Sequence, residues 1–164
     1  MATHATLAER VTFGRPLDTH EDTQIHVAPR PKMALIGRIL LAAIFLVSGF
    51  AKLTNTGETA AHMSGVGIPM AETLALVAGA AEILGALAIG FGFLTRLGAV
   101  GLILFMIPTT LLFHNFWMYE GVEQKTQMIN FLKNLTTIGG LSLLVASGPG
   151  LYSIDQKLRK RVAV

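Results

Sequence analysis

The segment MAETLALVAGAAEILGALAIGFGFL, residues 70–94, decides the fold, because beyond its first turn it carries a single charged residue, Glu82. At 1.5 Å per residue, about 20 helical residues cross a hydrocarbon core of about 30 Å, and about 17–25 are tolerated. The segment does not alternate with the period of two that a barrel strand requires. Its alanine, leucine and glycine content suits a tightly packed helix. The segment therefore predicts a membrane-spanning helix.

Three further apolar stretches, at residues 33–53, 97–113 and 128–146, have lengths that also fit a membrane span. Charged residues make up 14% of the 164 residues, against about 25% in soluble domains. The link at 92–96 leaves room only for a tight turn, so the second and third helices form an antiparallel hairpin. Small residues spaced by four along the second stretch predict close helix contacts. We therefore expect an all-α fold, a transmembrane four-helix bundle.

The membrane domain is expected over residues 33–156. Residues 1–32 contain three of the six prolines and no sustained apolar run, so we expect a polar N-terminal tail that is disordered or bound to a partner. Nothing in this region resembles the apolar part of a cleavable signal peptide. Residues 157–164 form a basic C-terminal tail.

The positions of the basic residues predict the orientation. Four spans place both termini on one side, and the thirteen basic residues divide ten to three between the two sides. The ten are Arg10, Arg15, Arg30, Lys32, Arg38, Arg96, Lys157, Arg159, Lys160 and Arg161, and the three are Lys52, Lys125 and Lys133. The positive-inside rule then puts both termini in the cytoplasm. Orientation explains the basic excess, so nucleic acid is not an expected partner.

Glu82 is the most informative charged residue. It lies twelve residues from either end of its stretch, so about 18 Å from each boundary. A carboxylate at that depth normally faces a partner or a water-filled cavity. We expect an intramembrane ion pair between Glu82 and Arg38, which lies a few residues inside the first span. A structural role for this pair, or a protonated Glu82 bonded to a neighbouring helix, is the alternative to a role in proton or ligand binding.

A second group of polar residues is expected near the outer helix ends. Its members offer hydrogen-bond donors, an imidazole and a flat aromatic ring, which suit a carbonyl-bearing amphipathic ligand such as a quinone head group. The alternative is a polar face that bonds adjacent helices, with Lys133 extending to the interface. The residues of this candidate ligand pocket are Ser48, Lys52, His114, Trp117, Asn130, Lys133 and Asn134.

The residue types that are absent limit the chemistry. The chain has no cysteine, which excludes disulfides and thiol chemistry of its own. Only His114 lies near a span, and no closely spaced histidines and carboxylates occur in the membrane region, so neither intrinsic haem nor a metal site is expected. No phosphate loop, G-x-S-x-G or H-E-x-x-H motif is present. We expect no intrinsic cofactor and assign no catalytic residue.

Six motifs in order along the chain carry a resemblance to the DoxX family. Residues 34–156 resemble these small four-span inner-membrane proteins of bacteria and archaea, some of which are described as subunits of quinone-linked oxidoreductases. The motifs are Gly37-Arg38 with Ser48-Gly49 and Lys52-Leu53, Ala81-Glu82 with Gly85-Ala86, Gly92-Phe93-Leu94-Thr95-Arg96, Leu112-Phe113-His114-Asn115-Phe116-Trp117, Phe131-Leu132-Lys133-Asn134 with Gly139-Gly140, and Gly148-Pro149-Gly150 with Ser153-Ile154-Asp155.

The resemblance implies a multi-pass protein of the bacterial inner membrane. We expect an accessory subunit of a membrane redox assembly, not catalytic alone, with quinone as the candidate ligand. Its expected partners are membrane lipids and either other subunits or further copies of the chain. Because the chain lacks cysteine, sulfur chemistry would need a partner's thiol or cofactor. The alternatives are a small-molecule or proton-coupled carrier that titrates Glu82, and a non-catalytic scaffold or assembly factor.

Overall fold

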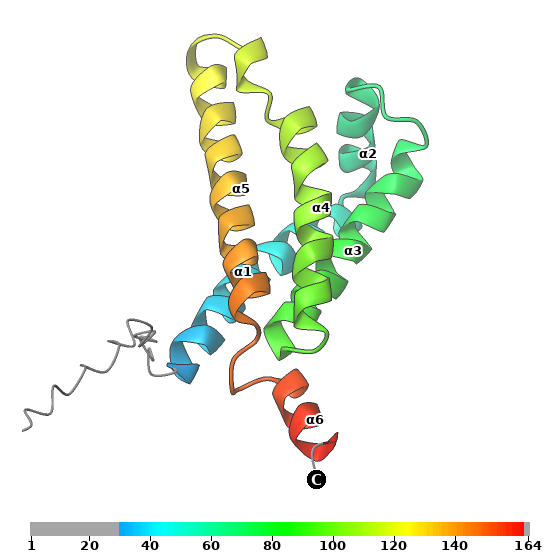
Figure 1. Ribbon diagram of the computed structural model, residues 1–164. Coiled ribbons are helices and arrows are strands. Elements are labelled where there is room, and N and C mark those ends of the chain that lie inside the picture. The colour runs from blue at the N-terminus through cyan, green and yellow to red at the C-terminus, as the bar shows by residue number, and fades with distance from the viewer. Residues whose placement is uncertain (1–29, 163–164) are drawn as a thin grey trace, which may run out of the picture.

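The computed structural model describes residues 30–162, and this part of the chain is helical with no strand (Figure 1). Four helices are long and apolar enough to cross a membrane, which confirms the predicted all-α, four-span architecture. They are α1 (Pro31–Thr54), α3 (Ala71–Phe91), α4 (Thr95–Phe113) and α5 (Gly121–Ser147). All but the last three residues of the expected N-terminal tail, 1–32, lie outside the described residues.

The connections divide the bundle into two ends (Figure 1). One end, called the α6 end, holds the start of α1, the α3–α4 turn, the end of α5 and a short helix, α6 (Ile154–Val162). The opposite α2 end holds α2 (Thr56–Gly65) and the 3-10 turn η1 (Phe116–Met118). Helix α1 packs along α3, and α4 packs along α5, while α3 also contacts α2 and α4.

Three features outside the spans differ from expectation. Helix α5 begins at Gly121 rather than near residue 128, because its first turns carry polar residues that hydropathy does not associate with a span. Helix α2 lies in the connection between the first and second expected spans, where no helix was predicted. Residues 157–162 of the expected basic tail belong to α6, in which Ile154, Leu158 and Val162 recur every four residues, and residues 163–164 lie outside the described part of the chain. Such short amphipathic helices have no long apolar run to reveal them.

The backbones of α1 and α3 approach each other closely at two glycines. A Cβ atom added to Gly49 would lie 2.8 Å from the carbonyl oxygen of Gly79 and 2.8 Å from a side-chain carbon of Ile83. A Cβ atom on Gly79 would lie 3.1 Å from the carbonyl oxygen of Gly49. Only glycine at both positions allows the two backbones to come this close, as small residues do between membrane helices.

The buried core is narrow, and most large apolar side chains face outward. The main core lies at the centre of the four spans, and a smaller one joins α2 to the start of α3. Side chains such as Val47 and Leu143 are more than 70% exposed. A helix that is apolar on all sides is typical of a segment surrounded by lipid. The main core consists of Ala42, Phe45, Ala86, Ile89, Ala99, Leu102, Met106, Leu141 and Leu144.

Replacing Gly49 tests the α1–α3 contact. We expect Gly49→Ala to lower the free energy of unfolding by about 1–3 kcal/mol, because overpacking forces the two backbones apart. Unfolding is followed by circular dichroism during SDS titration of the protein in detergent micelles. The matched control is Gly101→Ala on α4, where an added Cβ meets nothing within 4 Å. An equal effect of the two changes would contradict the close contact.

Candidate functional site

Lys52 on α1 and Glu82 on α3 form an ion pair inside the bundle. The Lys52 Nζ lies 3.1 Å from Oε1 and 3.0 Å from Oε2 of Glu82. It also donates to Ser48 Oγ, one turn earlier on α1, at 2.7 Å. The three N–H groups of the ammonium therefore have three acceptors. The Glu82 side chain is 5% exposed and that of Lys52 is 21% exposed. Lys52 is therefore the more accessible partner of the pair.

The expected pairing of Glu82 with Arg38 is wrong, because Glu82 binds Lys52 instead. The register of the two antiparallel helices explains the error. Gly49 lies opposite Glu82, since its added Cβ would lie 3.1 Å from the Glu82 Cβ. Arg38 is eleven residues before Gly49, or about 16 Å along the helix axis. The small residues that set this register were visible in the sequence and could have indicated Lys52.

Arg38 is nevertheless buried, and it connects distant parts of the chain. Its side chain donates to the carbonyl oxygens of Pro149 and, at 2.6 Å, of Tyr152, both between α5 and α6. A longer bond of 3.4 Å reaches the carbonyl oxygen of Gly90 near the end of α3. Helix ends and connecting segments present unpaired carbonyl groups, which a guanidinium can satisfy several at a time. Arg38 therefore holds the α5–α6 connection against α1 and α3.

Asp155 on α6 completes this second cluster. Its carboxylate accepts hydrogen bonds from the backbone N–H groups of Leu94 and Thr95, at 2.8 and 3.0 Å, and from Thr95 Oγ1 at 2.7 Å. It thus caps the N-terminus of α4 from a distant part of the chain. Burial raises the pKa of Asp155, but the bonds from Thr95 and Leu94 and the nearby Arg38 outweigh it, so the pKa lies below its usual value. Asp155 lies in one of the motifs that resemble the DoxX family, but no role was predicted for it; its position as a lone acid beside a basic run was the available signal.

Four of the seven residues of the expected pocket form two hydrogen-bonded groups. Ser48 and Lys52 lie with Glu82 between α1 and α3. His114 Nδ1 is 2.8 Å from Gln127 Oε1, and Asn134 donates to Thr110 Oγ1 at 3.1 Å, so these residues join α4 to α5. No hydrogen bond within residues 30–162 connects the two groups.

The remaining three pocket residues lie on η1 and α5. Trp117 packs edge-on against Phe116 and Phe131, Asn130 is half-buried and Lys133 is exposed. Binding of a ligand by all seven residues therefore stays a prediction. The hydrogen bonds of His114 and Asn134 between α4 and α5 match the alternative of a polar face that bonds adjacent helices.

An apolar groove lies on the outer surface of α1. It has a volume of about 660 Å³ and is lined by side chains of α1 with Asn55 and with Ile83 of α3. Phe50, which is 65% exposed, and Val47 are among its apolar lining residues. Lys52 and Glu82 do not line the groove, but their chain neighbours Ala51 and Ile83 do. The groove therefore lies one residue along each helix from the ion pair.

These observations define the class of protein as an integral membrane protein built on a four-span bundle with an internal ion pair. A family model described as DoxX matches residues 33–115. The chain is 36% identical over 130 residues to the inner membrane protein YphA of Escherichia coli strain K12, covering 79% of this chain and 93% of that protein. It is 42% identical over 129 residues to the inner membrane protein YqjF of the same strain, covering 77% and 92%.

A third relative is the uncharacterized membrane protein Rv3486 of Mycobacterium tuberculosis, 30% identical over 143 residues, or 84% of this chain and 87% of that protein. No solved structure matches. The chain belongs to the DoxX family, as the resemblance predicted, and two of these relatives, YphA and YqjF, are inner membrane proteins.

A double-mutant cycle tests the ion pair. We expect Lys52→Met to lower the free energy of unfolding by about 3 kcal/mol, because it leaves a buried carboxylate without its counter-charge. Adding Glu82→Gln should restore most of that loss, as measured by SDS titration. The control, Lys125→Met on the exposed first turn of α5, should change stability by less than about 0.5 kcal/mol. Additive effects of the changes at Lys52 and Glu82 would show that the two side chains do not interact.

The carboxylate of Asp155 predicts a loss of stability in acid. A group whose pKa is lowered on folding stabilises the folded state above its unfolded pKa, near pH 4, and this stabilisation is lost as the pH falls through the folded pKa. The melting temperature of the wild type should therefore fall between about pH 5 and pH 2. Asp155→Asn should already melt lower at neutral pH, and the difference between the two proteins should shrink in acid. A constant difference across this range would contradict the role of the charge.

Proposed function

We propose that this protein is an accessory integral-membrane subunit of a redox assembly, not catalytic alone, and that it binds a quinone, or a lipid in its place, at the outer end of α1 and α3. The observation that carries the proposal is the position of the Lys52–Glu82 pair next to the apolar groove along α1. This arrangement differs from the sequence-based pocket, since it draws its residues from one pair of helices.

The chemistry of the pair suits the carbonyl group of a quinone. Lys52 is the more exposed partner, and its bond to Ser48 can be exchanged for a bond to a ligand carbonyl while the bonds to Glu82 remain. Charge-assisted hydrogen bonds of this kind are stronger than neutral ones. The groove, lined by Val47 and Phe50 among others, offers apolar surface for the isoprenoid tail. Ligand sites of this type combine much apolar surface with a few polar groups.

The accessory role rests on what the chain itself can supply. It contains no cysteine, so thiol or sulfur chemistry would have to come from another subunit. The exposed apolar side chains of all four spans leave ample surface for a partner helix as well as for lipid.

The orientation of the chain forms part of the same proposal. Of the eleven basic residues between positions 30 and 162, eight lie toward the α6 end and three, Lys52, Lys125 and Lys133, toward the α2 end. The positive-inside rule then favours a cytoplasmic α6 end, with both termini in the cytoplasm. The groove beside Lys52 would open toward the outer half of the membrane.

A proton-coupled carrier is the second candidate, and the depth of Glu82 favours it. A carboxyl group that is 4% exposed near the middle of a span is typical of proton pathways. The carrier and the accessory subunit differ in whether they require partner proteins. A carrier moves protons in liposomes that contain only this protein, and Glu82→Gln would abolish that movement, whereas an accessory subunit requires its partners.

Purification from native membranes tests the first proposal. We expect the protein, extracted in a mild detergent, to copurify with other subunits and with quinone detected by mass spectrometry. Lys52→Met should lower the quinone content by about tenfold, the loss expected for one charge-assisted hydrogen bond, and Lys125→Met serves as the control. A monodisperse homo-oligomer that carries neither a partner subunit nor a quinone would contradict the proposal.

A further inference from the structure

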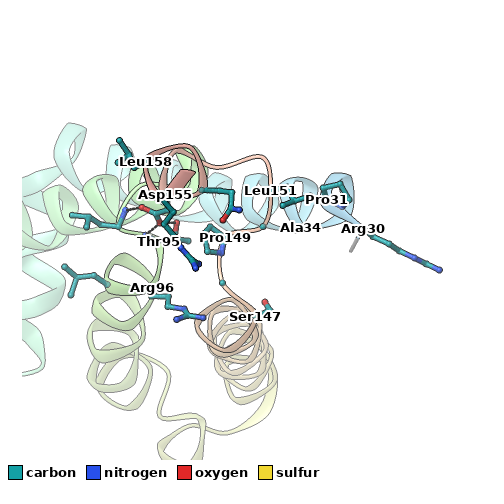
Figure 2. Close-up of a pocket in the computed structure, with 16 residues that line it drawn as sticks. Arg30, Pro31, Ala34, Thr95, Arg96, Ser147, Pro149, Leu151, Asp155 and Leu158 are labelled. Atoms are coloured by element: carbon teal, nitrogen blue, oxygen red, sulfur yellow. Dashed lines mark hydrogen bonds between the residues drawn. The ribbon is translucent and has the colours of Figure 1, made fainter. Parts of the chain in front are cut away.

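We propose that a cavity at the α6 end of the bundle binds the phosphate group of an anionic phospholipid. The cavity encloses about 770 Å³ and lies between the start of α1, the N-terminus of α4, the end of α5 and α6. Figure 2 shows these segments around it. The site lies at the opposite end of the bundle from the groove beside Lys52 and shares no residue with it, so it is independent of the proposed quinone site.

The lining of the cavity is positively charged. Arg30, Arg96 and Arg159 line it, and Asp155 is the one acidic residue among the lining residues. The Asp155 carboxylate is turned toward Thr95 (Figure 2) and already accepts three hydrogen bonds from Leu94 and Thr95. Its single negative charge is outnumbered by the three arginines, so the cavity offers a net positive site for an anion.

Arg96 is the central anion-binding group. Its side chain extends from the first turn of α4 toward Ser147 at the end of α5 (Figure 2). The bond from its Nη2 to the carbonyl oxygen of Ala146 measures 3.5 Å, which is at the limit for a hydrogen bond. A guanidinium has five N–H donors in a planar fork that matches phosphate oxygens two at a time. Most of these donors therefore stay available to a phosphate.

The other two arginines contribute from different elements. Arg159 reaches the cavity from α6, and Arg30 from the residue before α1. In Figure 2 Arg30 extends away from the other labelled residues, so it lies at the rim of the site. Arg96 and Arg159 therefore supply charge to the cavity from two separate elements, and Arg30 adds a third charge at its rim.

The apolar part of the lining favours a lipid over a soluble anion. Leu97, Leu151 and Leu158 line the same cavity, and they are 68%, 46% and 44% exposed. Leu97 belongs to a membrane span, and Leu158 lies on the apolar side of α6, with Ile154 and Val162. Basic amphipathic helices of this kind lie in the interface between headgroups and acyl chains. A headgroup bound by the arginines would place its acyl chains along these leucines.

Lipid titrations of the full-length protein test this site. The protein in a neutral detergent is titrated with short-chain phosphatidylglycerol, short-chain phosphatidylcholine or inorganic phosphate, and binding is measured by native mass spectrometry. We expect phosphatidylglycerol to bind and phosphatidylcholine to bind much more weakly, because its choline group cancels the phosphate charge. The double variant Arg96→Gln/Arg159→Gln should bind phosphatidylglycerol about tenfold more weakly, through loss of charge-assisted bonds.

The matched control is Lys160→Gln/Arg161→Gln, which removes two charges from α6 at positions that do not line the cavity. This variant should bind phosphatidylglycerol within about twofold of the wild type, since neither side chain lines the cavity that holds the phosphate. Equal weakening by the two double variants would show general attraction to a basic surface and would overturn the site. Binding of inorganic phosphate as tight as that of the lipid would also overturn it, in favour of a soluble anion.

A third variant keeps the proposal testable if the double variant does not fold. If Arg96→Gln/Arg159→Gln does not purify as a folded protein, Arg159→Gln alone changes an exposed residue of α6 and leaves Arg96 in place. It should still weaken phosphatidylglycerol binding relative to Lys160→Gln. Unchanged binding in Arg159→Gln would overturn the proposal that the cavity holds the headgroup.

Discussion

The contact between Gly49 and Gly79 sets the register of α1 against α3, and the positions of the buried charges depend on that register. Because the backbones meet at these glycines, Glu82 lies opposite the C-terminal half of α1 and within reach of Lys52. The same register places Arg38 beside the last turn of α3, where it bonds the carbonyl oxygen of Gly90 and those of Pro149 and Tyr152. Two charges that are costly in a membrane thus receive different partners at different depths. A shift of one turn between the helices would separate both charges from their partners.

The spans could be predicted from the sequence because hydropathy and length depend on each segment alone. The first, second and third spans were placed within a few residues of α1, α3 and α4. Helices α2 and α6 and the first turns of α5 were missed, since they are polar or amphipathic and lie outside the apolar stretches. An intramembrane ion pair of Glu82 was predicted, but with Arg38 in place of Lys52. The pairing depends on the register of α1 against α3, which only the matching of small residues across the two helices could have indicated.

Charged side chains are paired toward the α2 end of the bundle and are in positive excess at the α6 end. At the α2 end the ion pair is closed on itself, with each ammonium hydrogen of Lys52 bonded. At the α6 end Asp155 is occupied by the N-terminus of α4, and arginines surround a cavity without a matching number of carboxylates. The Lys52–Glu82 pair carries no net charge, whereas the cavity at the α6 end carries a net positive charge. The distribution of charge is therefore asymmetric along the long axis of the bundle.

The bonds from Arg38 also constrain the order in which the chain is completed. Arg38 belongs to α1, yet its acceptors at Pro149 and Tyr152 follow α5 in the chain. During synthesis, the Arg38 guanidinium has none of these carbonyl partners until α5 and the segment after it have been made. The α5–α6 connection can therefore join α1 to α3 only after all four spans have been synthesised.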